Sequence, residues 1–269
     1  MAARRAMPLA LLFALLLALL FAPALAPATG AAWAQEAGRP SSERKAADSA
    51  HQRYFLIGPE EGVQAPKRGF ALLVALPGGD GSAEFHPFVK RIVENTLDKE
   101  WIAAQPVAVR WTEAQQIVWP TAKVRAEKMA FTTEEFVEAV IADVKGAHAV
   151  DASRIFLLAW SSSGPAAYSL SLLPKKSPTG FYIAMSVFRP DKLPDLDEAK
   201  GEAYFLDHSP DDQVCPYPMA QDAEKRLSKK GAKVKLVPYA GGHGWHGDLY
   251  GRLRQGWSWL EENRSRAAR

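Results

Sequence analysis

Three separate loops of the sequence carry the side chains that nucleophilic catalysis requires. Ser161 stands in a run of three serines after an apolar segment, Asp212 lies in an acidic loop, and His243 lies among glycines. A serine hydroxyl is a weak nucleophile until a histidine takes its proton, and a carboxylate must orient that histidine. Residues of these three types, each following an apolar run, predict an acyl-transfer site.

The size of the flanking residues indicates which of the three serines is best placed to act. A nucleophile on a sharp strand-to-helix turn needs small residues two positions before and two positions after it. Ser161 meets this condition with Ala159 and Ser163. Ser162 has the bulky Trp160 two positions before it, and Ser163 has a proline two positions after it. The stretch favours Ser161 as the nucleophile, and a serine that caps a buried helix is the alternative.

The segment Arg154–Tyr168, RIFLLAWSSSGPAAY, resembles the nucleophile turn of α/β-hydrolase esterases. The likeness is to the exported phospholipase/carboxylesterase and polyhydroxybutyrate-depolymerase-like group, in which an apolar strand leads into Gly-aromatic-Ser-x-Gly-Gly. Ala159 and Ser163 replace two of these glycines, and Gly164 matches the last one. The resemblance extends from Gly69 to the last helix. It implies the α/β-hydrolase fold, a triad in the order Ser, acid, His, and hydrolysis of carboxylic esters.

The acid of that triad would come from the segment FLDHSPDDQVCPYPMA, which resembles the family's His-Gly-x-x-Asp-x-x-Val-Pro loop. His208 takes the histidine position and Asp212 the acid position, so the resemblance implies that Asp212 orients the catalytic histidine. Asp211 is the second candidate, while Asp207 is expected to lie still on the preceding strand. A turn rich in aspartate that caps the next helix is the alternative interpretation.

The histidine would come from the segment YAGGHGWHGDLYG, which follows the last predicted strand. Glycines allow a tight loop to bring one side chain close to a site. His243, within Gly-Gly-His-Gly-Trp, resembles the family's catalytic histidine before the terminal helix. His246 is the competing candidate, but it lies nearer the start of that helix, where a capping or surface role is expected.

Acyl transfer also needs backbone N–H donors for the developing oxyanion. The resemblance implies that one donor is Ser162, the residue after the nucleophile, and that the other lies in the segment LPGGDGSAEF. Gly79 is expected to be this second donor, while Gly78 and Gly81 allow a close approach of the backbone. Pro77 stands where the family has a histidine. An ordinary glycine-rich turn is the alternative, and the segment lacks the lysine and the spacing of a phosphate-binding loop.

The elements that must position these loops alternate between strand and helix patterns. The strands are continuous apolar runs, which is typical of an α/β protein with a mostly parallel sheet and helices on both faces. In such a sheet the functional loops gather at the carboxyl ends of the strands. Predicted strands cover residues 69–77, 101–109, 154–160, 180–187, 202–209 and 233–239, and predicted helices cover residues 85–97, 132–148, 217–231 and 247–263, with a further helix that begins at residue 165.

The first 34 residues are expected to be a secretory signal peptide. Two arginines precede the apolar run Leu9–Ala22, and an Ala-x-Ala pattern ends at Ala34. The apolar run is short for a membrane span, so cleavage is favoured over anchoring and no stable span is expected afterwards. Residues 35–51 predict a flexible leader, and residues 52–269 an α/β-hydrolase domain. The protein is therefore expected to be secreted or periplasmic.

Composition argues against several other classes of protein. Lys and Arg number 33 against 30 Asp and Glu, and no basic block contains interleaved aromatic residues, so nucleic acid is not an expected partner. Cys215 is the only cysteine, which excludes an internal disulfide and Cys–Cys zinc motifs. No cofactor or metal is implied.

The sequence thus predicts an exported serine hydrolase that cleaves a small-molecule or polymer ester through an acyl-enzyme intermediate. A catalytically degenerate binding protein of the same fold is one alternative, suggested by Ala159, Ser163 and Pro77. A serine peptidase with the same triad is another. Four tryptophans are candidates either for an acyl pocket or for the core: Trp111, Trp119, Trp160 and Trp245.

Overall fold

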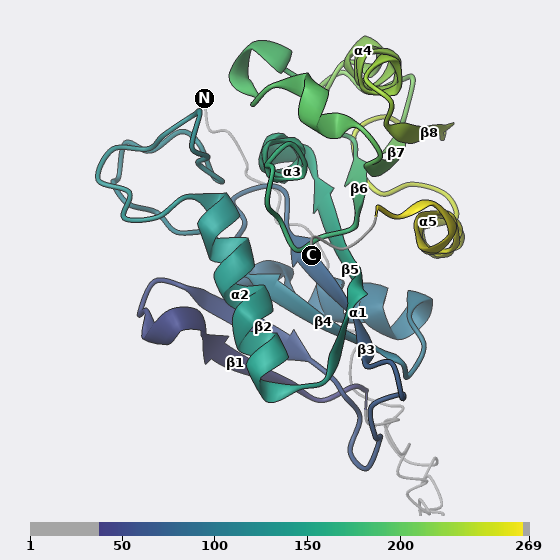
Figure 1. Ribbon diagram of the computed structural model, residues 1–269. Helices are drawn as coiled ribbons and strands as arrows, with labels where there is room; N and C mark the ends of the chain where they lie inside the picture. Colours follow the sequence, from purple (N-terminus) through teal and green to yellow (C-terminus); the bar gives the residue numbers. More distant parts are fainter. Residues whose placement is uncertain (1–37, 266–269) are drawn as a thin grey trace, which may run out of the picture. The chain divides into compact units, whose positions relative to one another are not determined.

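An eight-stranded sheet lies at the centre of the computed structural model, which describes residues 38–265 (Figure 1). The strand order is β1-β2-β4-β3-β5-β6-β7-β8. The strands are β1 (Ser41–Lys45), β2 (Arg53–Ile57), β3 (Phe70–Leu76), β4 (Trp101–Pro106), β5 (Val150–Trp160), β6 (Gly180–Ala184), β7 (Ala203–His208) and β8 (Lys233–Pro238). The pairs β1–β2 and β2–β4 are antiparallel, and all other pairs are parallel.

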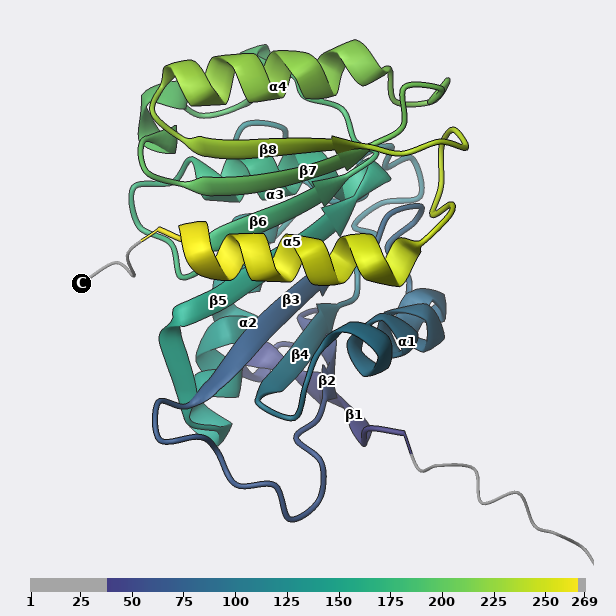
Figure 2. The same ribbon diagram turned by 90° about the vertical axis from the view of Figure 1, so that its right-hand side faces the viewer.

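Within residues 38–265, five α-helices pack on the two faces of this sheet. They are α1 (His86–Thr96), α2 (Thr133–Ala147), α3 (Gly164–Ser171), α4 (Tyr217–Lys229) and α5 (Leu249–Asn263). The buried residues of α1 and α5 share one apolar core, while those of α2, α3 and α4 share the other. Figure 2 shows α1 and α5 lying over the face of the sheet that is turned toward the viewer. The predicted α/β architecture, with helices on both faces, is therefore confirmed.

The register of the central strands explains why the functional loops meet. Leu76 at the end of β3 pairs with Ala159 on β5, and Ala159 pairs with Ile183 on β6. Farther along the sheet, His208 at the end of β7 pairs with Pro238 at the end of β8. The parallel strands therefore finish at one common edge, and the loops that follow β3, β5, β7 and β8 all leave the sheet there.

The predicted flexible leader is wrong over part of its length, because Ser41–Lys45 forms β1 at the edge of the sheet. Its five residues, Ser-Ser-Glu-Arg-Lys, are polar and mostly exposed, so no apolar alternation marks the strand. Backbone pairing with β2 holds it instead. The guanidinium of Arg39, which is buried, donates to the carbonyl oxygens of Trp101 and Leu97 and ties this segment to the sheet. The folded unit consequently begins before residue 52.

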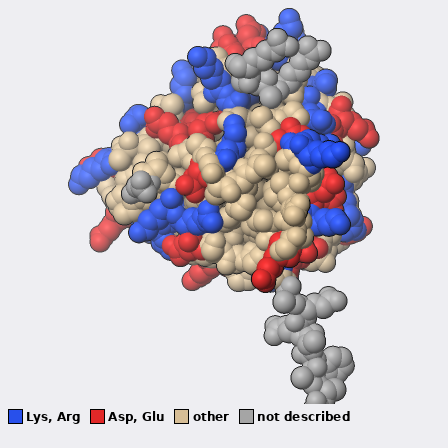
Figure 3. Space-filling view, turned by 60° about the horizontal axis from the view of Figure 1, so that its bottom comes forward, with Lys and Arg blue, Asp and Glu red and all other residues tan. Residues whose placement is uncertain are grey.

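The surface carries both signs of charge. On the face shown in Figure 3, lysine and arginine side chains stand beside aspartate and glutamate side chains without a large area of one sign. Within residues 38–265, none of the helices has the length and apolar character that crossing a membrane would require. The predicted signal peptide at residues 1–34 lies outside the described residues.

Candidate active site

Ser161 occupies a strained turn between β5 and α3. The strand ends at Trp160, residues Ser161–Ser163 form one turn of 3-10 helix, and α3 begins at the next residue. Ser161 has a φ of 54°, a left-handed backbone conformation that residues other than glycine rarely adopt. The hydroxyl of Ser186 donates to the carbonyl oxygen of Ser161 at 2.7 Å and supports this conformation. Such a turn presents the Ser161 side chain above the carboxyl edge of the sheet.

The residues beside Ser161 explain how the turn tolerates a serine in place of glycine. Ser163 is fully buried, and its hydroxyl accepts from the Trp160 amide at 2.9 Å and donates to the Leu76 carbonyl at 2.7 Å. These bonds connect the end of β5 to the end of β3. At Gly164, by contrast, an added Cβ would lie 2.0 Å from the hydroxyl oxygen of Ser186. The turn therefore requires glycine at position 164. At position 163 it is stabilised by the hydrogen bonds of the serine hydroxyl.

Three predicted residues form one continuous hydrogen-bonded chain. Ser161 Oγ lies 3.0 Å from Nε2 of His243, and Nδ1 of His243 lies 2.9 Å from Oδ2 of Asp212. The Asp212 side chain is fully buried, whereas the His243 side chain is 24% exposed. The competing candidates lie elsewhere: the carboxylate of Asp207 pairs with an arginine of α5, and His246 is exposed. Asp211 contributes its backbone carbonyl, and not its carboxylate, to a local hydrogen bond.

Several donors surround the carboxylate of Asp212. Oδ1 accepts from the amides of Val214 and Cys215, both at 2.8 Å, while Oδ2 faces His243. Burial alone would raise the pKa of this carboxyl, but the hydrogen bonds from the Cys215 amide and from His243 outweigh burial and hold the pKa below its ordinary value. Asp212 is therefore ionised at neutral pH and can stabilise a positive charge on His243.

The loop that carries His243 has little regular structure of its own. Gly241, Gly242 and Gly244 all adopt positive φ values. Contacts with the surroundings hold the loop in place. The amide of Gly242 donates to the hydroxyl of Ser209 at 3.0 Å, and the hydroxyl of Tyr239 donates to the carbonyl of Gly244 at 2.7 Å.

A buried ion pair supports the far end of the same loop. Nη1 of Arg252 on α5 donates to the carbonyl of His246 at 2.8 Å, while its Nε bonds to Asp207 at 3.0 Å. The guanidinium also lies 4.2 Å from the ring centroid of Tyr239. Sequence reasoning missed this role of Arg252. The presence of Asp207 could have indicated this role, because a carboxylate inside an apolar strand requires a charged partner.

The predicted oxyanion loop lies directly against the nucleophile turn. An added Cβ at Gly78 would come within 2.6 Å of Trp160, so only glycine permits this approach. Gly79 has a φ of 58°, and its carbonyl accepts a hydrogen bond of 2.8 Å from the hydroxyl of Ser162. Within residues 38–265, the Gly79 amide has no hydrogen-bond partner. Gly79 and Ser162, the two predicted donors, are therefore neighbours.

Trp119 anchors the predicted oxyanion loop, in which Pro77 stands at the position where the related pattern has a histidine. Nε1 of Trp119 donates to the carbonyl of Pro77 at 2.9 Å, and the Trp119 ring lies against Gly81. The amide of Ala108 donates to the carbonyl of Gly81 at 2.9 Å. The long connection between β4 and α2 thus supplies the support that Pro77 cannot give through its own side chain.

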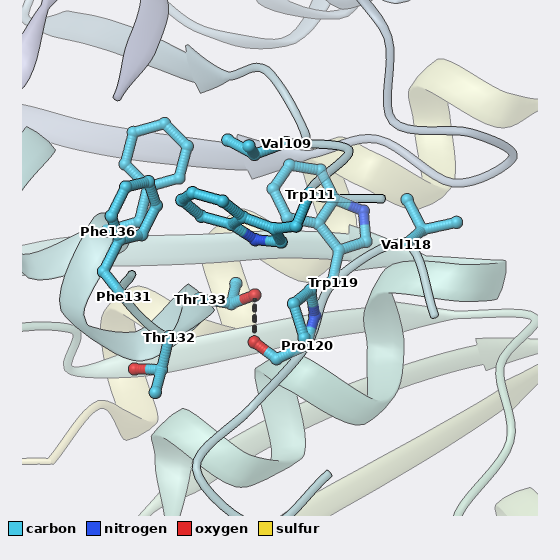
Figure 4. A pocket seen from close by; sticks show the side chains of 9 residues that line it. All are labelled: Val109, Trp111, Val118, Trp119, Pro120, Phe131, Thr132, Thr133 and Phe136. Atoms are coloured by element: carbon cyan, nitrogen blue, oxygen red, sulfur yellow. Dashed lines mark hydrogen bonds between the residues drawn. The ribbon is translucent and has the colours of Figure 1, made fainter. Parts of the chain in front are cut away.

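The four candidate tryptophans separate into two groups on opposite faces of the sheet. Trp160 and Trp245 lie 5.8 Å apart and pack with Phe85 and Phe88 on the side of α1 and α5. The other two line a small apolar cavity of about 10 Å³ near the start of α2, with space for about one water molecule (Figure 4). The pocket is lined by Val109, Trp111, Val118, Trp119, Pro120, Phe131, Thr132, Thr133 and Phe136. Trp119 consequently joins this pocket to the oxyanion loop.

Among the described residues, one group of side chains has the spacing of metal ligands. Ligand atoms of Asp212, Cys215 and His243 all lie within 4.8 Å of one another. Burial raises the pKa of the Cys215 thiol to about 11, so the thiol is protonated at neutral pH. Because Asp212 and His243 already bond to each other, this donor set fits a hydrogen-bonded pair with a neighbouring thiol better than a metal centre.

Comparison with known proteins supports the fold through structure and not through sequence. No model of a known protein family matches the sequence, and no curated protein matches it. The solved structures do contain similar folds. MGS-M1, an alpha/beta hydrolase enzyme from a deep-sea metagenome library of the Medee basin, superposes with a TM-score of 0.56 at 16% identity, over 77% of this chain and 84% of that one.

Two further structures show the same similarity. Esterase 2 of Thermogutta terrifontis, solved as the form phosphorylated by paraoxon, has a TM-score of 0.58 at 15% identity, over 84% of this chain and 94% of that one. Dipeptidyl peptidase 4 of Porphyromonas gingivalis has a TM-score of 0.60 at 13% identity, over 84% of this chain and 36% of that one. The chain therefore has the α/β-hydrolase fold.

Proposed function

We propose that this protein is a serine hydrolase that cleaves carboxylic esters through an acyl-enzyme intermediate. The observation that carries the proposal is the continuous chain from Ser161 Oγ through His243 to Asp212, which begins at a residue held at positive φ. Independent elements supply the three side chains, so a fortuitous contact would have to arise at two places at once. The esterases among the similar folds favour the same chemistry.

In the proposed reaction, Ser161 Oγ attacks the ester carbonyl carbon while Nε2 of His243 takes the hydroxyl proton. The charge of Asp212 stabilises the resulting imidazolium. The amides of Gly79 and Ser162 donate to the oxyanion of the tetrahedral intermediate. When that intermediate collapses, the alcohol leaves with the proton from His243, and the acyl group remains on Ser161. Water then attacks the acyl-enzyme by the same route and releases the acid.

The proposal includes export, for which the sequence of residues 1–34 is the support. A secreted or periplasmic hydrolase would meet small-molecule or polymer esters, and no nucleic-acid partner is proposed.

Replacement of Ser161 by alanine tests the nucleophile. We expect Ser161→Ala to lower the turnover of p-nitrophenyl acetate and butyrate by more than about 10⁴-fold, since no other group can carry the acyl chain. A fluorophosphonate probe should label the wild type at Ser161 alone, as mapped by peptide mass spectrometry. The matched control is Ser42→Ala, at an exposed serine of β1, which should retain both activity and labelling.

The same experiment separates the alternatives. Labelling at Ser161 without ester turnover, together with cleavage of aminoacyl p-nitroanilides, would favour a peptidase, which the dipeptidyl peptidase among the similar folds suggests. Absence of labelling and of both activities would favour a degenerate binding protein. Labelling at Ser162 would overturn the assignment of the nucleophile.

A further inference from the structure

A second histidine contacts the proposed catalytic carboxylate. His208 is the last residue of β7 and is 2% exposed. Its Nε2 lies 2.7 Å from the carbonyl oxygen of Cys215 and 3.2 Å from Oδ2 of Asp212. Because a carbonyl oxygen can only accept a hydrogen bond, the Nε2 of His208 must carry a proton and donate it. The same nitrogen also lies against the carboxylate of Asp212.

Two imidazoles consequently share one oxygen atom. Nδ1 of His243 lies 2.9 Å from Oδ2 of Asp212, on which Nε2 of His208 also converges. Oδ1 is occupied by two backbone amides, so both oxygens of this carboxylate are engaged. A carboxylate that accepts more hydrogen bonds is a weaker base, and it attracts the proton of each individual donor less strongly.

Burial, and not the surrounding charges, favours the neutral form of His208. Burial lowers the pKa of His208, although its bond to the Cys215 carbonyl and the charge of Asp212 act in the opposite direction. The other ionisable groups that face it are His243, the ring of Tyr217 at 5.8 Å and the neighbouring Asp207. His208 therefore acts on Asp212 as a fixed dipole, and not as a second full charge.

We propose that His208 is a positioning residue that holds the Asp212 carboxylate and sets the pH range in which His243 can act as a base. This inference rests on the proposed hydrolase function. Together with Nδ1 of His243, Nε2 of His208 restrains Oδ2 of Asp212 and withdraws part of its basicity. Without this donor, Asp212 would stabilise the protonated form of His243 more strongly. The base would then become available only at higher pH.

Two variants of nearly equal size isolate the donor. Gln at position 208 keeps an N–H near the place of the imidazole Nε2, whereas Met at the same position fills similar space without a donor. In His208→Met we expect the acid limb of the pH profile of kcat/KM to move upward by about 0.5 to 1 pH unit, with a smaller change of the plateau at high pH. In His208→Gln the limb should stay close to its wild-type position. p-Nitrophenyl butyrate serves as the substrate.

A purely structural role predicts a different result. If His208 were only structural, the plateau of kcat/KM at high pH would fall in His208→Met while the acid limb of the pH profile stayed in place. This outcome would overturn the proposal. An equal shift in both variants would overturn it as well, because the donor would then not be the cause. Should the Met variant fail to fold, His208→Asn replaces it, since its amide is too short to reach Asp212 while its side chain stays polar.

A measurement without substrate keeps this inference separate from the proposed function. In the Ser161→Ala background, the imidazole proton resonances of His243 are titrated by NMR, with and without His208→Met. The titration midpoint of His243 should rise in the Met variant even if the protein hydrolyses no ester. An unchanged midpoint contradicts the inference, whereas absence of ester turnover alone contradicts only the proposed function.

Discussion

At the scale of single residues, the serines that follow Ser161 in the nucleophile turn do more than occupy little space. Ser163 is more than a small residue, because its hydroxyl joins the Trp160 amide to the Leu76 carbonyl inside the core. Ser162 contributes a hydroxyl that reaches Gly79 on the oxyanion loop. The two serines that are not proposed as nucleophiles therefore bind the turn to the loop beside it.

Removal of the Ser163 hydroxyl should destabilise the fold. We expect Ser163→Ala to lower the free energy of unfolding by about 1–3 kcal/mol, because the buried amide of Trp160 would lose its hydrogen-bond acceptor. The measurement is urea denaturation followed by circular dichroism. The matched control is Ser162→Ala, whose more exposed hydroxyl should cost less than about 1 kcal/mol. Equal stability of the two variants would show that the Ser163 bridge is unimportant.

At the scale of elements, the position of His243 depends on α5 and β7 more than on its own loop. Three glycines with positive φ leave the loop few internal constraints, whereas Arg252 on α5 holds the carbonyl of His246 and pairs with Asp207 on β7. The hydroxyl of Tyr182 on β6 also donates to Asp207 at 2.8 Å. Three elements of the folded core thus converge on the support of one functional loop.

Substitution of Arg252 tests this support. Arg252→Met should lower the free energy of unfolding by about 3–5 kcal/mol, because Asp207 would remain buried without its charged partner. We also expect kcat on p-nitrophenyl butyrate to fall more than KM rises, since His243 would lose its fixed position. Arg254→Met, on the same helix at an exposed position, is the control and should change neither quantity appreciably. A cost below about 1 kcal/mol for Arg252→Met would contradict the role of the ion pair.

At the scale of the whole molecule, buried ionisable groups link the stability of the fold to pH. Burial lowers the pKa of His208 below 6.5, so the unfolded chain binds more protons than the native state as the pH falls through 6.5. Stability contributed by the neutral imidazole is therefore lost at acidic pH. Burial raises the pKa of Asp207 and Glu202, and these two carboxyl groups act in the opposite direction above their unfolded values.

The difference between wild type and His208→Gln isolates the histidine, because the carboxyl groups are common to both proteins. Between pH 7.5 and 5.5, we expect the wild type to lose about 1 kcal/mol more of its unfolding free energy than the variant, since each pH unit below 6.5 is worth at most about 1.4 kcal/mol per group. Urea denaturation at both pH values provides the comparison. Parallel pH dependences of the two proteins would indicate that His208 takes up a proton without unfolding.

The features of this protein that depend on local pattern could be predicted from its residues alone. Continuous apolar runs indicated the central strands, and size at the turn selected Ser161. The order of the loops placed Asp212 and His243 after it, at the edge where parallel strands end. The structure brings these three side chains into one hydrogen-bonded chain. Such features can be predicted because the burial of a strand, the size limit at a turn and the place of a loop after a strand are each visible in a short stretch of sequence.

The distant groups that support this hydrogen-bonded chain become apparent in the folded structure alone. β1 escaped prediction because an exposed edge strand needs no apolar pattern, only a partner strand. The Trp119 anchor on the oxyanion loop and the pair of Arg252 with Asp207 join residues more than 40 positions apart. The contact of His208 with Asp212 spans only four residues, yet it depends on the exact course of the loop between them. Hydrogen bonds of this kind depend on the distance and angle between atoms in the folded chain, and neither can be predicted from the neighbouring residue types.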